Sequence, residues 1–239
     1  MTRKLILSTL VIGSLVGGYF IHRGMQSTGA RTVQVARWFN NPEKHADWEI
    51  LQGERCGDAP FILPTDGIIG YVWDDSFRPG HRHQGLDIFG GNGLGVTPVI
   101  SAYEGYLTRK QGWTSALIVR IPSDPLHPER QIWLYYAHMA DAQGNSFIVD
   151  AFPRGTSEVK IPAGTLLGYQ GNYSGSPDNP TGIHLHFSIV KDDGYGNFMN
   201  EMDINNTYDP SPYFGMELNA NNNPAEIPTC KEQRLSNTD

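Results

Sequence analysis

Apolar residues along the chain fall mostly into short runs, and in many of these runs every second position is apolar. The segment TGIHLHFSIV at 181–190 is the plainest case, because its isoleucines, Leu185 and Phe187 occupy alternate positions. A period of two is typical of β-strands that bury one face. Glycine and proline separate the runs, and a helical period is weak throughout. The pattern predicts an all-β, β-rich domain.

Seven segments carry the strand signal, and loops separate them. Strands are expected in 61–73 with breaks at Pro64 and Gly67, at the end of 76–91, on both sides of a turn near Glu104, and in 115–121, 131–139, 161–171 and 181–190. Loops are expected at 122–128 and 140–160. The chain after Lys191 is largely polar and irregular.

The chain is long enough for one domain of ordinary size. We divide it into an export segment at 1–23, a linker with room for a short helix at 24–55, a β-rich domain at 56–215, and a C-terminal tail at 216–239.

The first residues have the order of an export signal. Arg3 and Lys4 precede an uncharged apolar run at Leu5–Ile21. This arrangement favours an exported protein that an uncleaved signal-anchor holds in the membrane. The alternative is a signal peptide cleaved after the small residues at 28–30, which would release a secreted protein.

Charge and cysteine content restrict the partners and the compartment. The formal net charge is −7, and no cluster of lysine and arginine marks a nucleic-acid surface, so no nucleic-acid partner is expected. Cys56 and Cys230 lie on either side of the β-rich region. In an exported protein such a pair is more often bridged than free, and we expect a disulfide, with two free thiols as the alternative.

Histidine is the residue type that could carry chemistry here, and the chain has 8 of them. His22, His45 and His127 are expected at the surface. The other five lie in or beside predicted strands: His81, His83, His138, His184 and His186.

His83 and Asp87 lie on one face if their segment is a strand, but a flat strand would separate their backbones by about 13 Å. One metal ion could bind both only if the chain bends between them, and Gly85 at the midpoint permits such a bend. The spacing alone also arises by chance. His81 has a different phase and is expected to line a groove or the surface.

Strand alternation places His184 and His186 on one face with Cα atoms roughly 6.6 Å apart, so both could serve one site. A solvated strand face that happens to carry two histidines is the alternative. His138 is expected to share the strand phase of Leu134 and Tyr136. Two histidines with one aspartate form an open zinc set, and two further histidines could handle protons.

Three short motifs occur in a defined order along the chain. HQGLD at 83–87 fits H-x-G-x-D, YAHM at 136–139 fits Y-x-H-[LM], and HLHF at 184–187 fits H-L-H-F. On these motifs the chain resembles the lysostaphin-type (LytM-like) zinc metallopeptidases, which cut peptides of bacterial peptidoglycan, over roughly residues 61–214.

The resemblance implies a fold and a site. The fold would be the lysostaphin/LytM-like one, a duplicated hybrid motif whose antiparallel β-sheets form a groove. One zinc ion per chain would be held by His83, Asp87 and His186, while His138 and His184 would be the catalytic pair. Zinc would activate a bound water and polarise the scissile carbonyl. His184 would transfer protons, and His138 would stabilise the oxyanion or share in proton handling.

The implied function is a zinc-dependent endopeptidase that hydrolyses peptide cross-links or stem peptides of peptidoglycan. The alternative is a catalytically silent or partner-gated LytM-like module that binds the wall or regulates other wall hydrolases. Expected partners are a peptidoglycan peptide, the membrane through the N-terminal segment, and a regulatory envelope protein. The expected location is the periplasm with an inner-membrane anchor, or outside the cell after cleavage. Loops 122–130 and 140–160 are longer than expected for this family and could border the groove.

Overall fold

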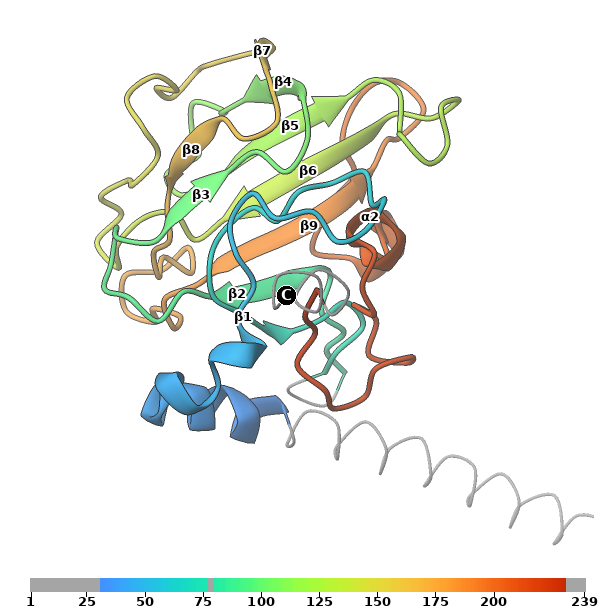
Figure 1. Ribbon diagram of the computed structural model, residues 1–239. Coiled ribbons are helices and arrows are strands. Elements are labelled where there is room, and N and C mark those ends of the chain that lie inside the picture. Colours follow the sequence, from blue (N-terminus) through green and yellow to red (C-terminus); the bar gives the residue numbers. More distant parts are fainter. Residues whose placement is uncertain (1–30, 77–79, 231–239) are drawn as a thin grey trace, which may run out of the picture.

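The computed structural model describes residues 31–76 and 80–230 (Figure 1). The predicted export segment, including Leu5–Ile21 and the alternative cleavage site at 28–30, lies outside the described residues. Within 31–76 and 80–230, no helix is both long enough and apolar enough to cross a membrane.

Two antiparallel sheets make up most of the described chain. The larger has the order β1-β2-β9-β6-β5-β4-β7, with β10 paired to β9, and the smaller consists of β3 and β8. Figure 1 shows the larger sheet from β7 at the top to β1 at the bottom. The predicted all-β class with antiparallel sheets is confirmed. The strands are β1 (Ile68–Tyr71), β2 (Leu86–Phe89), β3 (Pro98–Ile100), β4 (Gly105–Thr108), β5 (Leu117–Ile121), β6 (Ile132–Ala137), β7 (Val159–Ile161), β8 (Leu166–Tyr169), β9 (Leu185–Lys191) and β10 (Thr207–Tyr208).

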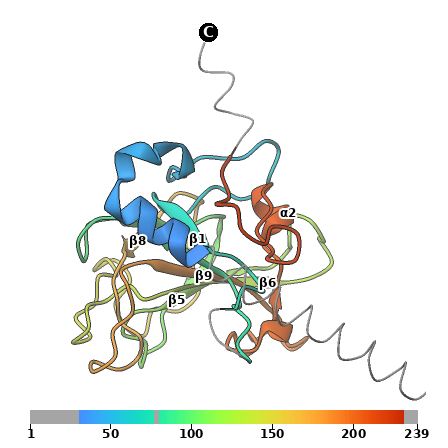
Figure 2. The ribbon, with the colours of Figure 1, turned by 90° about the horizontal axis from the view of Figure 1, so that it is seen from below.

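Helices occupy the two ends of the described chain. Residues 31–40 are helical and lie across the β1 edge of the larger sheet (Figure 2). The remaining helices are short: η1 (Pro42–Lys44), η2 (Ala46–Trp48), η3 (Ile204–Asn206) and α2 (Ser211–Phe214).

The main core lies between one face of the larger sheet and the β3–β8 sheet. Leu134 and Phe187 from the larger sheet and Val99 and Leu167 from the smaller are fully buried in the same cluster. Alternation in β9 sends Leu185, Phe187 and Ile189 into this core, so the residues between them face the opposite side of the sheet.

The two strands on either side of Glu104 exist as predicted, but they do not pair with each other. β3 pairs with β8, whereas β4 pairs with β5 and β7. The chain therefore crosses from the smaller sheet to the larger one between Ile100 and Gly105.

The two long loops leave the larger sheet at different ends. The loop between β5 and β6 begins where Ile121 pairs with Ile132, which is the end of β6 away from Ala137 and its partner His186. The segment 140–158 follows directly after His138. The loop expected at 140–160 therefore starts beside the predicted site, whereas the loop expected at 122–130 lies at the other end of β6. The groove itself stays a prediction.

The domain boundaries drawn at residues 55 and 215 stay predictions, although packing crosses both. Ile50, Met216 and Leu218 belong to the main core. The predicted disulfide between Cys56 and Cys230 is present, with Cα atoms 5.2 Å apart. It joins the entry of the domain to the segment that follows α2.

We expect the double exchange Cys56→Ala with Cys230→Ala to lower the free energy of unfolding by about 2–5 kcal/mol, because the bond restricts the unfolded chain. The two cysteines are separated by 174 residues, so the loop that the bond closes is long. Urea unfolding followed by tryptophan fluorescence measures the change, with reduced wild type as the control. Equal midpoints for the oxidised wild type and the double variant would contradict the expectation.

Candidate metal centre

The first two candidate ligands are brought together by a bend just before β2. His83 lies in the loop and Asp87 in the strand, and His83 Nε2 is 3.0 Å from Asp87 Oδ1. Gly85 lies midway, at the bend itself. A Cβ atom there would lie 2.1 Å from the carbonyl oxygen of Phe187, so a larger residue would push β9 away. The glycine is needed for close approach of the two strands.

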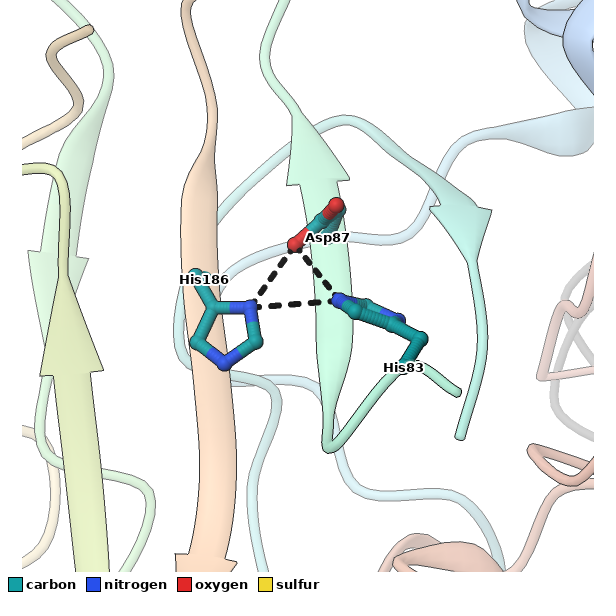
Figure 3. A group of neighbouring side chains, drawn as sticks. All are labelled: His83, Asp87 and His186. Atoms are coloured by element: carbon teal, nitrogen blue, oxygen red, sulfur yellow. Dashed lines mark hydrogen bonds and ion pairs between the residues drawn. The ribbon is translucent and has the colours of Figure 1, made fainter. Parts of the chain in front are cut away.

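Strand pairing supplies the third ligand. β2 and β9 are antiparallel with Asp87 opposite His186, and His186 Nδ1 lies 2.9 Å from Asp87 Oδ1. The distance from His186 Nδ1 to His83 Nε2 is 3.2 Å, so the three donor atoms form a nearly equilateral triangle (Figure 3). Tetrahedral zinc with bonds of about 2.1 Å separates its ligand atoms by roughly 3.4 Å. The triangle needs only a small expansion to accept the ion.

Hydrogen bonds to backbone carbonyls fix which nitrogen of three imidazoles faces the site. His83 Nδ1 donates to Val72 O at 3.0 Å, His138 Nδ1 to Tyr173 O at 2.7 Å, and His184 Nδ1 to Gly182 O at 2.7 Å. A carbonyl oxygen can only accept, so Nδ1 carries the hydrogen, and in the neutral ring Nε2 has the lone pair. In His83 that lone pair points at the triangle.

His186 has the opposite orientation. Its Nδ1 belongs to the triangle, and its Nε2 lies 3.7 Å from Glu201 Oε2. Metal-binding histidines usually have such a partner on the second nitrogen, which fixes the tautomer and the orientation of the ring. Glu201 has this position here.

Electrostatics favour a cation among these groups. Burial by itself raises the pKa of Asp87, but the imidazoles of His83 and His184 outweigh burial and hold that pKa well below its usual range. Burial lowers the pKa of His186, whereas the carboxylates of Asp87 and Glu201 raise it, to about 10. A metal ion must therefore displace a proton from His186, and binding releases that proton.

The predicted strand phase of His138 is wrong. β6 ends at Ala137, and His138 has a φ of 68°, in the left-handed region. Tyr136 points into the core, and continued alternation would have sent His138 the same way. The left-handed residue breaks the alternation and turns the imidazole toward the other face, where its ring centroid lies 4.5 Å from that of His184.

His184 lies next to the triangle without being part of it. Its Nε2 is 3.4 Å from Asp87 Oδ1, and its ring stacks on Phe89 with centroids 5.2 Å apart.

Burial, together with the imidazoles of His184 and His186, lowers the pKa of His138 to about 3, so His138 is neutral at physiological pH.

All five predicted site residues therefore meet in one place, although their roles stay predictions. The group that could hold a metal consists of His83, Asp87 and His186. His81 lies outside this group, with its ring centroid 6.5 Å from that of His83.

Glu201 is the residue that sequence reasoning missed. It lies in the irregular stretch after β9, where no motif or periodicity distinguishes one carboxylate from another. Its loop is tied to the first motif, because Gln84 Nε2 donates to Met202 O at 2.9 Å. Glu201 Oε2 is buried and accepts no hydrogen bond from the described part of the chain. Gln84 of the HQGLD motif was thus the one signal in the sequence, and it does not show which later residue lies beside it.

No protein-family model matches the sequence, and no curated protein matches it significantly. Among solved structures, lysostaphin from Staphylococcus simulans is similar at 18% identity and a TM-score of 0.40, covering 62% of this chain and 49% of that one. Csd3 from Helicobacter pylori is similar at 23% identity and a TM-score of 0.34, covering 54% of this chain and 29% of that one. The catalytic domain of the prophage-encoded M23 protein EnpA from Enterococcus faecalis is similar at 18% identity and a TM-score of 0.38, covering 63% of this chain and 96% of that one.

This chain thus matches about half the length of lysostaphin and less than a third of Csd3.

We expect Glu201→Gln to weaken zinc binding about tenfold, because the carboxylate that faces His186 Nε2 at 3.7 Å is lost. Competition with a chromophoric chelator measures the zinc affinity of the full chain. Met202→Ala is the matched control, since that neighbouring side chain is 68% exposed. If Glu201→Gln bound zinc as tightly as wild type, Glu201 would not support His186.

Proposed function

We propose that this chain is a zinc-dependent endopeptidase that hydrolyses peptides of bacterial peptidoglycan. One observation carries the proposal. Three motifs far apart in the sequence converge in space, with His83 and Asp87, His138, and His184 and His186 all beside one another. Convergence of this kind is not expected of histidines that occupy a solvated strand face by chance.

The donor set fits zinc. Two imidazole nitrogens and one carboxylate oxygen, with further coordination positions left for water and substrate, are typical of catalytic zinc sites. A zinc ion held by His83, Asp87 and His186 would lower the pKa of a coordinated water and polarise the scissile carbonyl. A buried aspartate and two fixed imidazoles are positioned to hold one such ion per chain.

The two remaining histidines lie beside the proposed zinc ligands, and each has its Nδ1 bound to a backbone carbonyl. With Nδ1 bound to a backbone carbonyl, Nε2 of His184 is the atom that accepts a proton from the attacking water and returns it to the leaving amine. His138 has the same arrangement, and its lowered pKa leaves it neutral. A pKa of about 3 makes Nε2 of His138 a weak base, and donation to an oxyanion would require a hydrogen on that nitrogen, so both roles considered for His138 stay proposals.

The disulfide and the predicted export segment support a proposal for the compartment. A disulfide is typical of proteins that mature outside the cytoplasm. We propose a periplasmic enzyme anchored in the inner membrane, or a secreted one if the N-terminal segment is cleaved. A peptidoglycan peptide is the proposed substrate, and a regulatory envelope protein is a further proposed partner.

The proposal assigns different roles to two histidines of one motif. His184→Ala is expected to keep zinc and to lower kcat by about 10²–10⁴, because general acid–base help is lost. His186→Ala is expected to lose both zinc and hydrolysis. Zinc content by atomic absorption and hydrolysis of a peptidoglycan fragment separate the two. If His184→Ala abolished zinc binding with the fold intact, the two roles would need to be exchanged.

Digestion of purified sacculi tests the activity directly. The full chain is expected to release peptide fragments, identified by mass spectrometry, and the chelator-treated protein and His186→Ala are expected to release none. Identical products from wild type and His186→Ala would exclude the peptidase for the isolated protein. A regulator that acts through another wall hydrolase would then be the better account.

A further inference from the structure

We infer that the helical segment at residues 31–40 is a positioning element of the candidate site, which holds His83 and His184 in place from outside. The inference about catalysis rests on the proposed function, whereas the inference about metal binding does not. Two separate routes of contact lead from this helix to the site, and each ends at a different histidine.

The first route begins with a fully buried ion pair. Arg31 Nε lies 3.1 Å from Asp75 Oδ2, and both side chains are 0% exposed. The same guanidinium donates to Glu226 O at 2.8 Å and to Asn223 O. A charge buried this deeply requires its partners, so the start of the helix, the turn at Asp75 and the C-terminal segment occupy one fixed arrangement.

Backbone hydrogen bonds connect the turn at Asp75 to His83. Its carbonyl oxygen accepts from His83 N at 2.7 Å, and Asp74 N donates to His83 O at 2.8 Å. Val72 O accepts from the His83 ring, so the backbone and the imidazole of His83 are both held by the turn at 72–75. Residues 77–79 of the intervening loop lie outside the described residues. Arg31 thus fixes the turn that fixes a candidate metal ligand.

The second route runs through Phe89. Val35 and Trp38 of the helix are buried in a small cluster with Phe89, apart from the main core. Phe39 meets Phe89 edge to face at 5.9 Å. The ring of Phe89 in turn stacks on His184. Without the helix, one side of Phe89 would be exposed, and its ring could rotate away from the imidazole.

Two glycines leave space for this packing. A Cβ atom on Gly70 would lie 2.8 Å from Val35 Cγ2 and 2.6 Å from Phe89 Cε2. A Cβ atom on Gly91 would lie 2.6 Å from Trp38 Cη2. The edge strand β1 and the segment after β2 are thus shaped to receive the helix, which lies directly across β1 (Figure 2).

The first experiment addresses the route to His83 in the full chain. The double exchange Arg31→Met with Asp75→Asn removes both charges together, which avoids leaving one buried charge alone. We expect the zinc dissociation constant to rise about tenfold and the visible d–d spectrum of the Co²⁺-loaded protein to shift, because the position of His83 changes. A purely structural ion pair would alter the melting temperature but not this spectrum.

The second experiment addresses the route to His184. Trp38→Ala is expected to lower kcat about tenfold, because displacing a reacting group slows the chemical step. KM, the zinc affinity and the Co²⁺ spectrum should stay unchanged, because His184 is not a candidate metal ligand. Trp38→Phe should restore most of the rate by refilling the cluster. Val33→Ala is the matched control, because Val33 lies in the same helix but is 49% exposed.

Both experiments are run below the melting temperature of each variant, with circular dichroism as the check on folding. Protease sensitivity of the segment at 31–48 reports whether the helix has been released. A released helix with wild-type Co²⁺ spectrum, zinc affinity and kcat would overturn the inference. If wild type hydrolyses nothing, the proposed function fails separately. The route to His184 is then judged by the ¹⁵N shifts of its imidazole, which Trp38→Ala should change and Val33→Ala should not.

Discussion

The antiparallel pairing of β2 with β9 places Asp87 opposite His186, and the remainder of the candidate site depends on this register. A slip by one residue would turn every side chain of one strand to the other face. Leu86 and Ile88 on β2, and Leu185 and Phe187 on β9, are fully buried and resist such a slip. The apolar face of each strand therefore determines where the polar face presents its ligands.

Backbone carbonyls orient three of the four histidine rings at the candidate site. Crowding four imidazoles around one carboxylate is unfavourable unless each ring has a defined partner for its N–H group. Val72, Tyr173 and Gly182 supply carbonyl oxygens to three of the rings, and Glu201 lies beside the fourth. The outer partners come from loops rather than from the sheet. The sheet positions the candidate metal ligands, and the loops decide how their rings are turned.

Sequence alone predicted the class of the fold, which is confirmed, and it named five side chains that the structure brings together, because local patterns carry both. Alternation revealed the strands, and short motifs revealed the histidines and Asp87. The orientation of His138 escaped prediction because a single left-handed residue reverses a side chain without disturbing the alternation before it. Glu201 escaped because its partner belongs to another segment and no motif or periodicity marks its own stretch. The separation of β3 from β4 into two sheets likewise depends on pairing with strands far along the chain.

The hydrogen bonds of Arg31 have a consequence for when the protein matures. Its acceptors, Asn223 and Glu226, follow it by 192 and 195 residues. A chain still emerging during synthesis or export lacks these acceptors, so the helix cannot reach its final place until almost everything after it has been delivered. Contacts of such long range also form late, because closing a large loop is slow. The finished arrangement thus depends on the last residues of the described chain, as does the disulfide between Cys56 and Cys230.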